Sequence, residues 1–253
     1  VGAGAGGRVY LAEMEDGSLV AIKQCPESDI GFWREHYCKI IVHSNIVRRF
    51  SFFSHNMVNC IAMERLDLSV FDLLYPNGIK KTAVPLPYRS VLDIIVSVLK
   101  GLEKIHLEHF VFADLKPENV ARTENGKFVL LDFGMAGPTN TAVVGGTLGY
   151  MDPMITYGTL LQGHHDIYSA GYMLREIVTG EGQPMWSTEG PWDGLPFPAY
   201  LATRVSWMQT RMMGLPKNRP SAAECLLFFS GLLMEVDASS KAKGNALASI
   251  QED

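Results

Sequence analysis

The first residues that could do chemistry are three glycines near the start of the sequence. Gly2, Gly4 and Gly7 precede Val9 in the stretch GAGAGGRV, with the spacing G-x-G-x-x-G-x-V. Glycines at a turn let backbone N–H groups approach a phosphate without obstruction by a Cβ atom. A dinucleotide-binding fold shares this spacing, but there the third glycine opens a helix. Here the strand pattern continues through Val9 and Leu11, so we favour a turn between two strands that covers phosphates.

A lysine is the second candidate group. Residues 8–23 alternate around an Asp16-Gly17 turn, which predicts a β-hairpin. Lys23 ends the apolar run Val-Ala-Ile-Lys on the return strand, sixteen residues after Gly7, so the hairpin places it beneath the glycine turn. A lysine at the end of a strand is usually just solvated. In this position its ammonium group could instead bind the α- and β-phosphates, provided that a carboxylate orients it.

The carboxylate that could orient Lys23 is Glu35. A helix is predicted over residues 29–42 with Ser28 or Asp29 as its N-cap, and Glu35 is the only acid in the body of that helix. As a surface residue Glu35 would simply be solvated. Beside Lys23 it would hold the ammonium group in place.

The order of further motifs along the chain points to one family. The sequence is similar to the eukaryotic-type protein kinase family over essentially its whole length. The matching motifs, in chain order, are Gly2/Gly4/Gly7, VAIK at 20–23, Glu35, HSNIV at 43–47, MERL at 63–66, DLKPEN at 114–119, DFG at 132–134, GTLGYMDP at 146–153, DIYSAG at 166–171 and NRP at 218–220. Any one motif could match by chance, but ten in the same order are strong support, because false positives multiply.

The resemblance implies phosphoryl transfer that depends on ATP and Mg²⁺, with roles for four polar residues. Asp132 would chelate a Mg²⁺ ion that bridges the phosphates, and Asn119 would hold a second ion, since hard oxygen ligands suit this metal. Asp114 would orient the acceptor hydroxyl and accept its proton, and Lys116 would place a cation at the transferred phosphoryl group. Taken alone, DLKPEN would be a Pro-containing turn with exposed charges.

The same resemblance implies an adenine pocket between two halves of the chain. Met63 would lie at the back of the pocket, and backbone groups of Glu64 and Leu66 would bond the purine edge. Val9 and Ala21 would cover the ring from above. Simple packing in the core of a strand would explain these two apolar residues equally well.

Serine and threonine hydroxyls of protein substrates are the acceptors that the resemblance favours. Lys116 within DLKPEN is typical of Ser/Thr kinases, and Thr147 is expected to bond to Asp114 and Lys116. Small-molecule kinases of related fold generally lack a segment like 146–153, so that class ranks lower.

Two departures from the family pattern lie next to Asp114. Phe112 and Ala113 replace the usual His-Arg. The usual His packs against the phenylalanine of DFG, and Phe112 against Phe133 could keep that contact as an aromatic pair. The usual Arg pairs with a phosphorylated residue of the activation loop, and Ala113 closes that route.

A third departure is Met154, which stands where Ala-Pro-Glu would place its Glu. That carboxylate normally meets an arginine equivalent to Arg219, and a buried guanidinium without a partner is costly. Asp152 could substitute for it. The departures favour a rival hypothesis, a kinase-fold scaffold that binds nucleotide or a protein partner with little transfer. Five intact polar residues oppose it: Lys23, Glu35, Asp114, Asn119 and Asp132.

The elements that must position these groups form an α+β, bilobal protein-kinase-like fold. Residues 1–64 would be a small β-rich lobe, with strands near 46–53 and 57–64 after the hairpin and helix. Residues 65–236 would be a larger helical lobe, and 237–253 a polar, frayed tail. Within the second lobe the pattern predicts a long helix from residue 89, a strand pair over 118–131 and a buried helix over 166–179. The cleft between the lobes is the default ligand site.

Composition places few limits on function. The 253 residues are 47% hydrophobic and 19% charged, as in an ordinary globular protein, and a net charge of −5 indicates neither nucleic acid nor an anionic membrane as partner. The apolar runs at 91–99 and 226–234 are too short or too broken to span a bilayer. Four cysteines without a C-x-x-C pair favour reduced, buried thiols and an intracellular, cytoplasmic setting.

Two further expectations concern the chain as a whole. Because the sequence opens on Val1 inside a glycine-rich run, we expect it to be part of a longer protein. Three pairs of basic side chains are interpreted as solvated surface groups: Arg48-Arg49, Lys80-Lys81 and His164-His165.

The loss of arginine at Ala113 predicts that any transfer activity is independent of phosphorylation between Gly134 and Asp152. Replacement of Thr139 or Thr141 by Glu should leave the transfer rate within about twofold of the parent, because Ala113 has no guanidinium group to pair with the new charge. Initial rates of phosphoryl transfer measure this. A phosphomimetic variant that switched activity on would contradict it.

Overall fold

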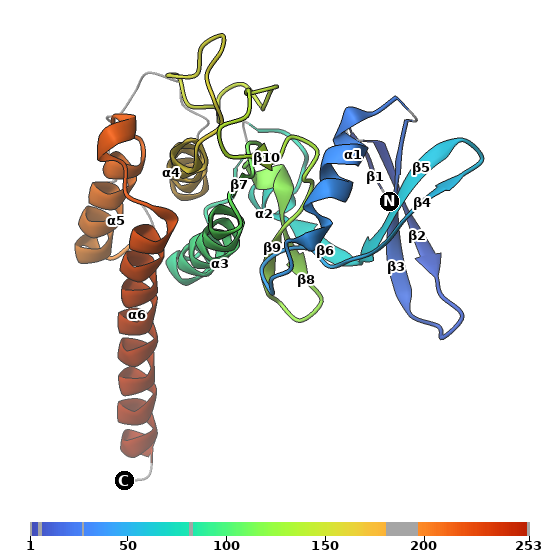
Figure 1. Cartoon of the computed structure of the whole chain (residues 1–253). Coiled ribbons are helices and arrows are strands. Elements are labelled where there is room, and N and C mark those ends of the chain that lie inside the picture. Colours follow the sequence, from blue (N-terminus) through green and yellow to red (C-terminus); the bar gives the residue numbers. More distant parts are fainter. Residues whose placement is uncertain (1, 5–6, 27, 81–82, 181–196, 252–253) are drawn as a thin grey trace.

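The computed structural model describes residues 2–4, 7–26, 28–80, 83–180 and 197–251 of the chain. Figure 1 shows two parts side by side, with the first five strands on one side and the long helices on the other. This arrangement confirms the bilobal α+β fold. Lys81 lies outside the described residues.

The N-terminal lobe is built on one antiparallel sheet of five strands in the order β1-β2-β3-β5-β4. The strands are β1 (Gly2–Gly4), β2 (Gly7–Glu13), β3 (Leu19–Cys25), β4 (Arg49–His55) and β5 (Val58–Glu64). The predicted hairpin is present as β2 and β3. Its turn depends on Gly17, whose φ of 79° favours glycine, and on the Asp16 carboxylate, which accepts a hydrogen bond from Ser18 N at 2.9 Å.

Helix α1 (Ile30–Tyr37) packs on this sheet and carries Glu35 on its buried face. Asp29 caps the helix by accepting a hydrogen bond from Gly31 N at 2.8 Å, which confirms one of the two predicted N-caps. The helix ends before the predicted limit at residue 42. The chain there tightens into a 3-10 turn, η1 (Cys38–Ile40), and becomes extended at Ile41.

The C-terminal lobe is helical and also contains a small three-stranded sheet and a separate pair of short strands. Its helices are α2 (Val70–Leu74), α3 (Tyr88–Leu107), α4 (Gly163–Thr179), α5 (Ala199–Met212) and α6 (Ala222–Gln251), with 3-10 turns η2 (Pro117–Asn119) and η3 (Pro216–Asn218). The strands β6 (Leu66–Ser69), β8 (Val120–Thr123) and β9 (Phe128–Leu130) form one small sheet, and β7 (Phe110–Val111) pairs with β10 (Gly137–Pro138). The predicted long helix, strand pair and buried helix are therefore confirmed as α3, β8–β9 and α4.

The core of this lobe lies between α3 and α4. The apolar stripe of α3 is buried along its length, and α4 is buried on nearly every face, because it runs through the middle of the lobe. All four cysteines of the chain are buried as thiols, as predicted. Within the described part of the chain, no helix has the length and apolar character needed to cross a membrane.

The C-terminal segment differs from the prediction of a frayed tail. Helix α6 continues to Gln251, and Figure 1 shows its end extending away from the rest of the lobe. The segment from residue 237 contains no proline, and four of its seventeen residues are alanine, which favours helix. Asp237 accepts a hydrogen bond from Arg89 Nε on α3 at 2.7 Å, which ties the start of this segment to the lobe.

The predicted substitution of Asp152 for the missing glutamate is confirmed as a contact. The Arg219 guanidinium binds Asp152 with two hydrogen bonds, one of them 3.0 Å from Nη2 to Oδ1. The side chains are only 1% and 0% exposed. Arg219 Nε also donates to the Gly214 carbonyl at 2.8 Å, so the buried charge is well satisfied. The pair joins the loop before α6 to the segment that precedes α4.

Breaking this pair should destabilise the fold strongly. Arg219→Met leaves the Asp152 carboxylate buried without its cation, and we expect a loss of about 3–5 kcal/mol in the free energy of unfolding. Arg204→Met is the matched control, because Arg204 pairs with Glu235 at the surface, where both side chains are more than 40% exposed. It should cost less than about 1 kcal/mol. Urea unfolding of both variants decides; equal losses would contradict a special role for the Asp152 pair.

Candidate active site

Lys23 contacts two carboxylates, Glu35 within its own lobe and Asp132 of the second lobe. Its Nζ lies 3.0 Å from Glu35 Oε2 and 2.8 Å from Asp132 Oδ1. Strand β3 supplies Lys23, helix α1 supplies Glu35, and the segment after β9 supplies Asp132. The contact between Lys23 and Glu35 that the sequence predicts is therefore present.

The groups around Lys23 keep its ammonium group protonated. Burial acts to lower the pKa of this ammonium group, but the charges of Glu35 and Asp132 outweigh burial and raise the pKa above its ordinary value. Burial likewise acts to raise the pKa of Asp132, and the charge and hydrogen bond of Lys23 bring it below the usual range. Both groups are therefore ionised at neutral pH.

Asp114 is held from four directions. Its Oδ1 accepts hydrogen bonds from Thr147 N at 2.9 Å and Thr147 Oγ1 at 2.7 Å. Its Oδ2 accepts from Lys116 Nζ at 2.8 Å and from Asn119 Nδ2 at 3.0 Å. Lys116 Nζ also donates to Thr147 Oγ1 at 2.7 Å. The predicted contacts of Thr147 with Asp114 and Lys116 are both present, and they fix one orientation of the carboxylate.

Two residues beside these groups have a backbone conformation that side chains rarely adopt. Ala113 has φ 66° and Asp132 has φ 68°, in the left-handed region. Such strain persists only where surrounding contacts hold it, and it concentrates at functional sites. In this protein, the left-handed backbone at Asp132 accompanies the contact of its side chain with Lys23. The same conformation at Ala113 turns the backbone immediately before Asp114.

Asp166 anchors the loop that carries Asp114, a role that our reading of the sequence missed. Its fully buried carboxylate accepts hydrogen bonds from Phe112 N and Ala113 N, each at 2.8 Å. Its Oδ2 also lies 2.9 Å from His106 Nε2. A sequence signal existed, because an aspartate at the start of a helix that is apolar on most faces must be buried and needs donors.

The aromatic pair predicted beside Asp114 is present. The rings of Phe112 and Phe133 are 5.1 Å apart between centroids at an interplanar angle of 81°, an edge-to-face contact, and both side chains are fully buried. Phe112 thus packs on the phenylalanine that follows Asp132. This contact joins the loop that carries Asp114 to the loop that carries Asp132.

Arg49 completes this cluster and corrects the interpretation of Arg48-Arg49 as solvated. Its guanidinium lies 4.5 Å from the centre of the Phe133 ring and donates to the carbonyls of Cys38 and Ile41, each at 3.1 Å. Arg49 is therefore mostly removed from water and joins β4 to the chain after α1. Arg48, in contrast, is exposed as predicted.

The residues predicted to surround a nucleotide lie on neighbouring strands. Gly7 must be glycine, because its φ is 118° and a Cβ atom there would meet Gln24 O at 2.0 Å. Val9 is opposite Lys23, and Ala21 is opposite Met63, in the registers of the sheet. Of the remaining predicted residues, Gly2 and Gly4 lie on β1, Glu64 ends β5 and Leu66 begins β6.

Two of the polar residues have oxygen atoms suited to Mg²⁺. Asn119 directs its Nδ2 to Asp114, with a further bond of 2.8 Å to the Asp114 carbonyl, so its Oδ1 faces away from these acceptors. Asp132 uses Oδ1 for Lys23 and for Gly134 N, and within the described residues no donor contacts Oδ2. Glu35 Oε1 is buried without a partner among the described atoms. Asn119 Oδ1 and Asp132 Oδ2 therefore remain as oxygen ligands for a hard cation.

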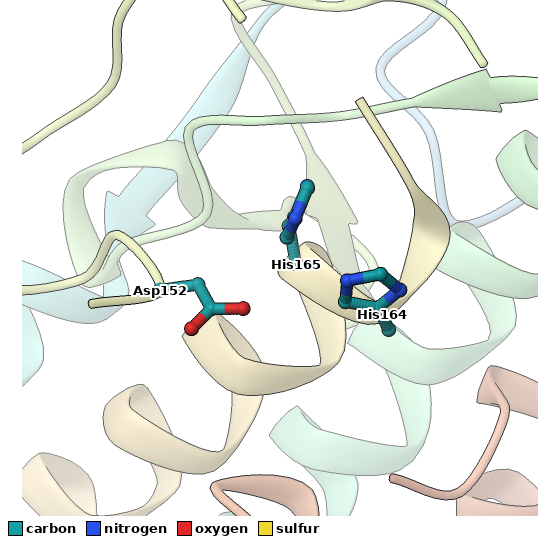
Figure 2. A group of neighbouring side chains, drawn as sticks. All are labelled: Asp152, His164 and His165. Atoms are coloured by element: carbon teal, nitrogen blue, oxygen red, sulfur yellow. The ribbon is translucent and has the colours of Figure 1, made fainter. Parts of the chain in front are cut away.

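A second group of possible metal ligands has a different explanation. Ligand atoms of Asp152, His164 and His165 lie within 4.8 Å of one another, and Figure 2 shows the three side chains gathered at the start of α4. The Arg219 guanidinium already neutralises the carboxylate and would repel a cation. His165 Nδ1 accepts from Gln162 N at 3.2 Å and caps the helix. His165 is buried, which corrects its interpretation as a solvated group.

Comparison with known proteins identifies the class. The protein kinase domain family matches residues 1–195, and the chain belongs to this family. It is 30% identical over 197 residues to a G-type lectin S-receptor-like serine/threonine-protein kinase of Arabidopsis thaliana, covering 72% of this chain and 24% of that protein. A receptor protein-tyrosine kinase of the same plant is 30% identical over 210 residues, covering 72% of this chain and 21% of that protein.

A third relative has a similar identity and coverage. A leucine-rich repeat receptor-like protein kinase of Arabidopsis thaliana is 28% identical over 199 residues, covering 72% of this chain and 19% of that protein. The chain thus spans less than a quarter of the length of these relatives. It is a protein kinase catalytic domain, and its similarity extends to kinases named for both classes of protein acceptor.

The Phe112–Phe133 contact generates a stability prediction. Phe112→Ala should reduce the free energy of unfolding by about 3–5 kcal/mol, because it leaves a cavity in a closed cluster. Phe112→Leu keeps most of the volume and loses only the aromatic contact, so we expect about 1–1.5 kcal/mol. Chemical denaturation followed by circular dichroism measures both values. Equal losses for the two variants would show that packing around Phe112 adds nothing specific.

Proposed function

We propose that this domain transfers the γ-phosphoryl group of Mg·ATP to serine and threonine hydroxyls of protein substrates. The observation that carries the proposal is the Asp114 carboxylate, held by Lys116, Asn119 and Thr147 in one orientation. A carboxylate fixed by donors beside a lysine has the properties of a base that receives the proton of an acceptor hydroxyl.

The nucleotide would lie beneath the glycine turn. Gly2, Gly4 and Gly7 allow backbone amides to approach the phosphates, and Lys23 would contact the α- and β-phosphates while Glu35 holds it. Its protonated state at neutral pH supports this role. Asp132 and Asn119 would hold Mg²⁺ through their remaining oxygen atoms. When bound, the metal would neutralise charge that develops on the phosphate oxygens.

The adenine ring would lie between the sheet and the second lobe. Val9 and Ala21 would cover it, with Met63 at the back. The Glu64 amide already donates to the Arg48 carbonyl at 2.9 Å, so Glu64 would contact the purine through its own carbonyl. The Leu66 backbone would supply the neighbouring contact.

Proton transfer at Asp114 requires a change in its hydrogen bonds. All four acceptor directions of this carboxylate are occupied by the donors described above. We infer that Lys116 leaves Oδ2 for the transferred phosphoryl group when both substrates are bound. The vacated position on Oδ2 then accepts the proton of the attacking hydroxyl. Thr147 keeps Oδ1 in place during this exchange.

A preference for serine and threonine is supported by Lys116 and Thr147. Their direct contact, 2.7 Å from Nζ to Oγ1, joins the catalytic loop to the segment expected to receive the substrate. A tyrosine acceptor is the alternative, because one similar protein is named a receptor protein-tyrosine kinase.

A nucleotide-binding scaffold with little transfer activity is the second candidate function. Ala113 and Met154 favour it, since both replace residues of the family pattern. The structure weakens this argument, because Asp152 takes the place of the missing glutamate toward Arg219 and Phe112 keeps the contact with Phe133.

Transfer of labelled γ-phosphate from Mg·ATP to a mixed panel of proteins separates the two functions. We expect label on Ser and Thr, and Asp114→Ala and Asp132→Asn should each lower the rate by at least about 10²-fold. Asp237→Asn is the matched control, since this aspartate forms a surface pair with Arg89 and should leave the rate unchanged. Phosphoamino acid analysis identifies the acceptor.

The other outcomes are equally informative. No transfer, with Mg·ATP still raising the melting temperature, would favour the scaffold. Label on tyrosine alone would overturn the acceptor preference. If Mg·ATP gives no phosphoryl transfer and also does not raise the melting temperature, both candidate functions are contradicted.

A further inference from the structure

A pocket of about 520 Å³ lies away from the groups that would perform phosphoryl transfer. It is bordered by the 3-10 turn η1, the segment from Ile41 to Arg48 and the turn between β8 and β9. Lys23, Asp114 and Asp132 do not line it. Its volume is within the range of sites that bind small molecules.

Exposed cations surround this pocket. Lys39, Arg48 and Lys127 line it, and within the described residues none of the three has a carboxylate within 4.0 Å. Lys39 Nζ lies 3.1 Å from His36 Nε2, a contact that leaves its charge uncompensated. The one acidic group among the lining residues, Glu64, accepts from Arg48 N at 2.7 Å. The pocket therefore has an excess of positive charge.

His43 adds a neutral donor at the same pocket. Its Nδ1 accepts a hydrogen bond from Asn45 N at 3.1 Å, so the ring proton resides on Nε2. Burial, and then the charges of Lys127, Lys104 and Lys100, lower the pKa of His43 below its ordinary value. Glu103 acts in the opposite direction and Lys104 is paired with Glu108, so Lys127 is the one of these lysines that adds positive potential within the pocket itself, where an anion would relieve it.

The floor of the pocket is apolar and already formed. Ile46 and Val129 form its base and are almost completely buried, while Val42, which also lines the pocket, is 76% exposed and presents apolar surface that a ligand could cover. Val47 N donates to Leu130 O and Leu130 N donates to Asn45 O, each at 2.9 Å, so the segment is fastened to β9. Figure 1 shows the chain after α1 passing close to this strand. An occupant would need little rearrangement of the backbone.

We propose that this pocket binds an organic phosphate, with an apolar body on the floor and the phosphate group at Arg48 and Lys127. Both features of the ligand are needed. A phosphate alone would leave the exposed Val42 side chain uncovered, and an apolar body alone would leave the cations uncompensated. The phosphate ester could belong to a free small molecule or to a phosphorylated tyrosine of a peptide, since the two share this chemistry.

Titration with 1-naphthyl phosphate tests the site in the whole chain by isothermal calorimetry. We expect saturable binding of one molecule, with weaker binding of inorganic phosphate and of neutral 1-naphthalenemethanol. Arg48→Gln and Lys127→Gln should each weaken binding by about tenfold, as for loss of one charge-assisted hydrogen bond. Both side chains are exposed, so neither change should disturb folding. Lys217→Gln is the matched control, because Lys217 is an exposed lysine remote from the pocket.

Competition and a second probe complete the experiment. Saturating Mg·ATP should not displace the naphthyl phosphate, because the three cations of the pocket are not assigned to the nucleotide site and Glu64, which borders both sites, would contact the purine only through its backbone carbonyl. A short peptide with phosphotyrosine, compared with its unphosphorylated form, distinguishes the sources: tighter binding of the peptide favours a phosphorylated protein, and tighter binding of the free ester favours a small molecule. Absence of saturable binding, displacement by Mg·ATP, or equal affinity of all three Gln variants would each overturn the proposal. None of these readouts requires phosphoryl transfer.

Discussion

The requirement that a buried charge be paired organises the structure around Lys23. This ammonium group lies beneath the sheet, where an unpaired charge would cost several kcal/mol, so Glu35 and Asp132 must approach it together. One carboxylate comes from α1 and the other from the segment after β9. The single cation therefore sets the position of the helix against the sheet and of Asp132 against the first lobe. The geometry of the candidate active site at this junction therefore follows from the need to pair one buried positive charge.

The same requirement orders the second lobe. Asp166 is fully buried at the start of α4, and it is satisfied by backbone amides of the loop that presents Asp114. Asp152 and Arg219 form a closed pair that joins the loop before α6 to the segment preceding α4. Buried pairs of this kind need not add net stability, but removal of either partner is costly, so they specify one arrangement of loops.

The departures from the family pattern show how contacts can survive a change of residue. Phe112 replaces a polar ring by an apolar one and still packs on Phe133, because edge-to-face packing needs an aromatic ring and no particular polar group. Asp152 lies two residues before Met154, the position where the family pattern has its glutamate, and still binds Arg219. A bidentate pair depends on where the carboxylate lies in space and not on its place in the motif. Two contacts expected from the family pattern are therefore kept by different residues in this chain.

Local patterns in the sequence were enough to predict the hairpin around Gly17, the N-cap at Asp29, the stripe of α3, and the approach of Lys23 to Glu35, since each depends on neighbours or on a known motif order. Two kinds of feature were not predictable. The helical course of α6 after residue 237 depends on a contact with α3 as well as on composition. The inward turn of Arg49, the burial of His165 and the role of Asp166 depend on which carbonyls, rings and amides the folded chain brings beside them. Charge and polarity can be read from the sequence, but whether a polar group meets water or a partner is decided only when distant segments pack together.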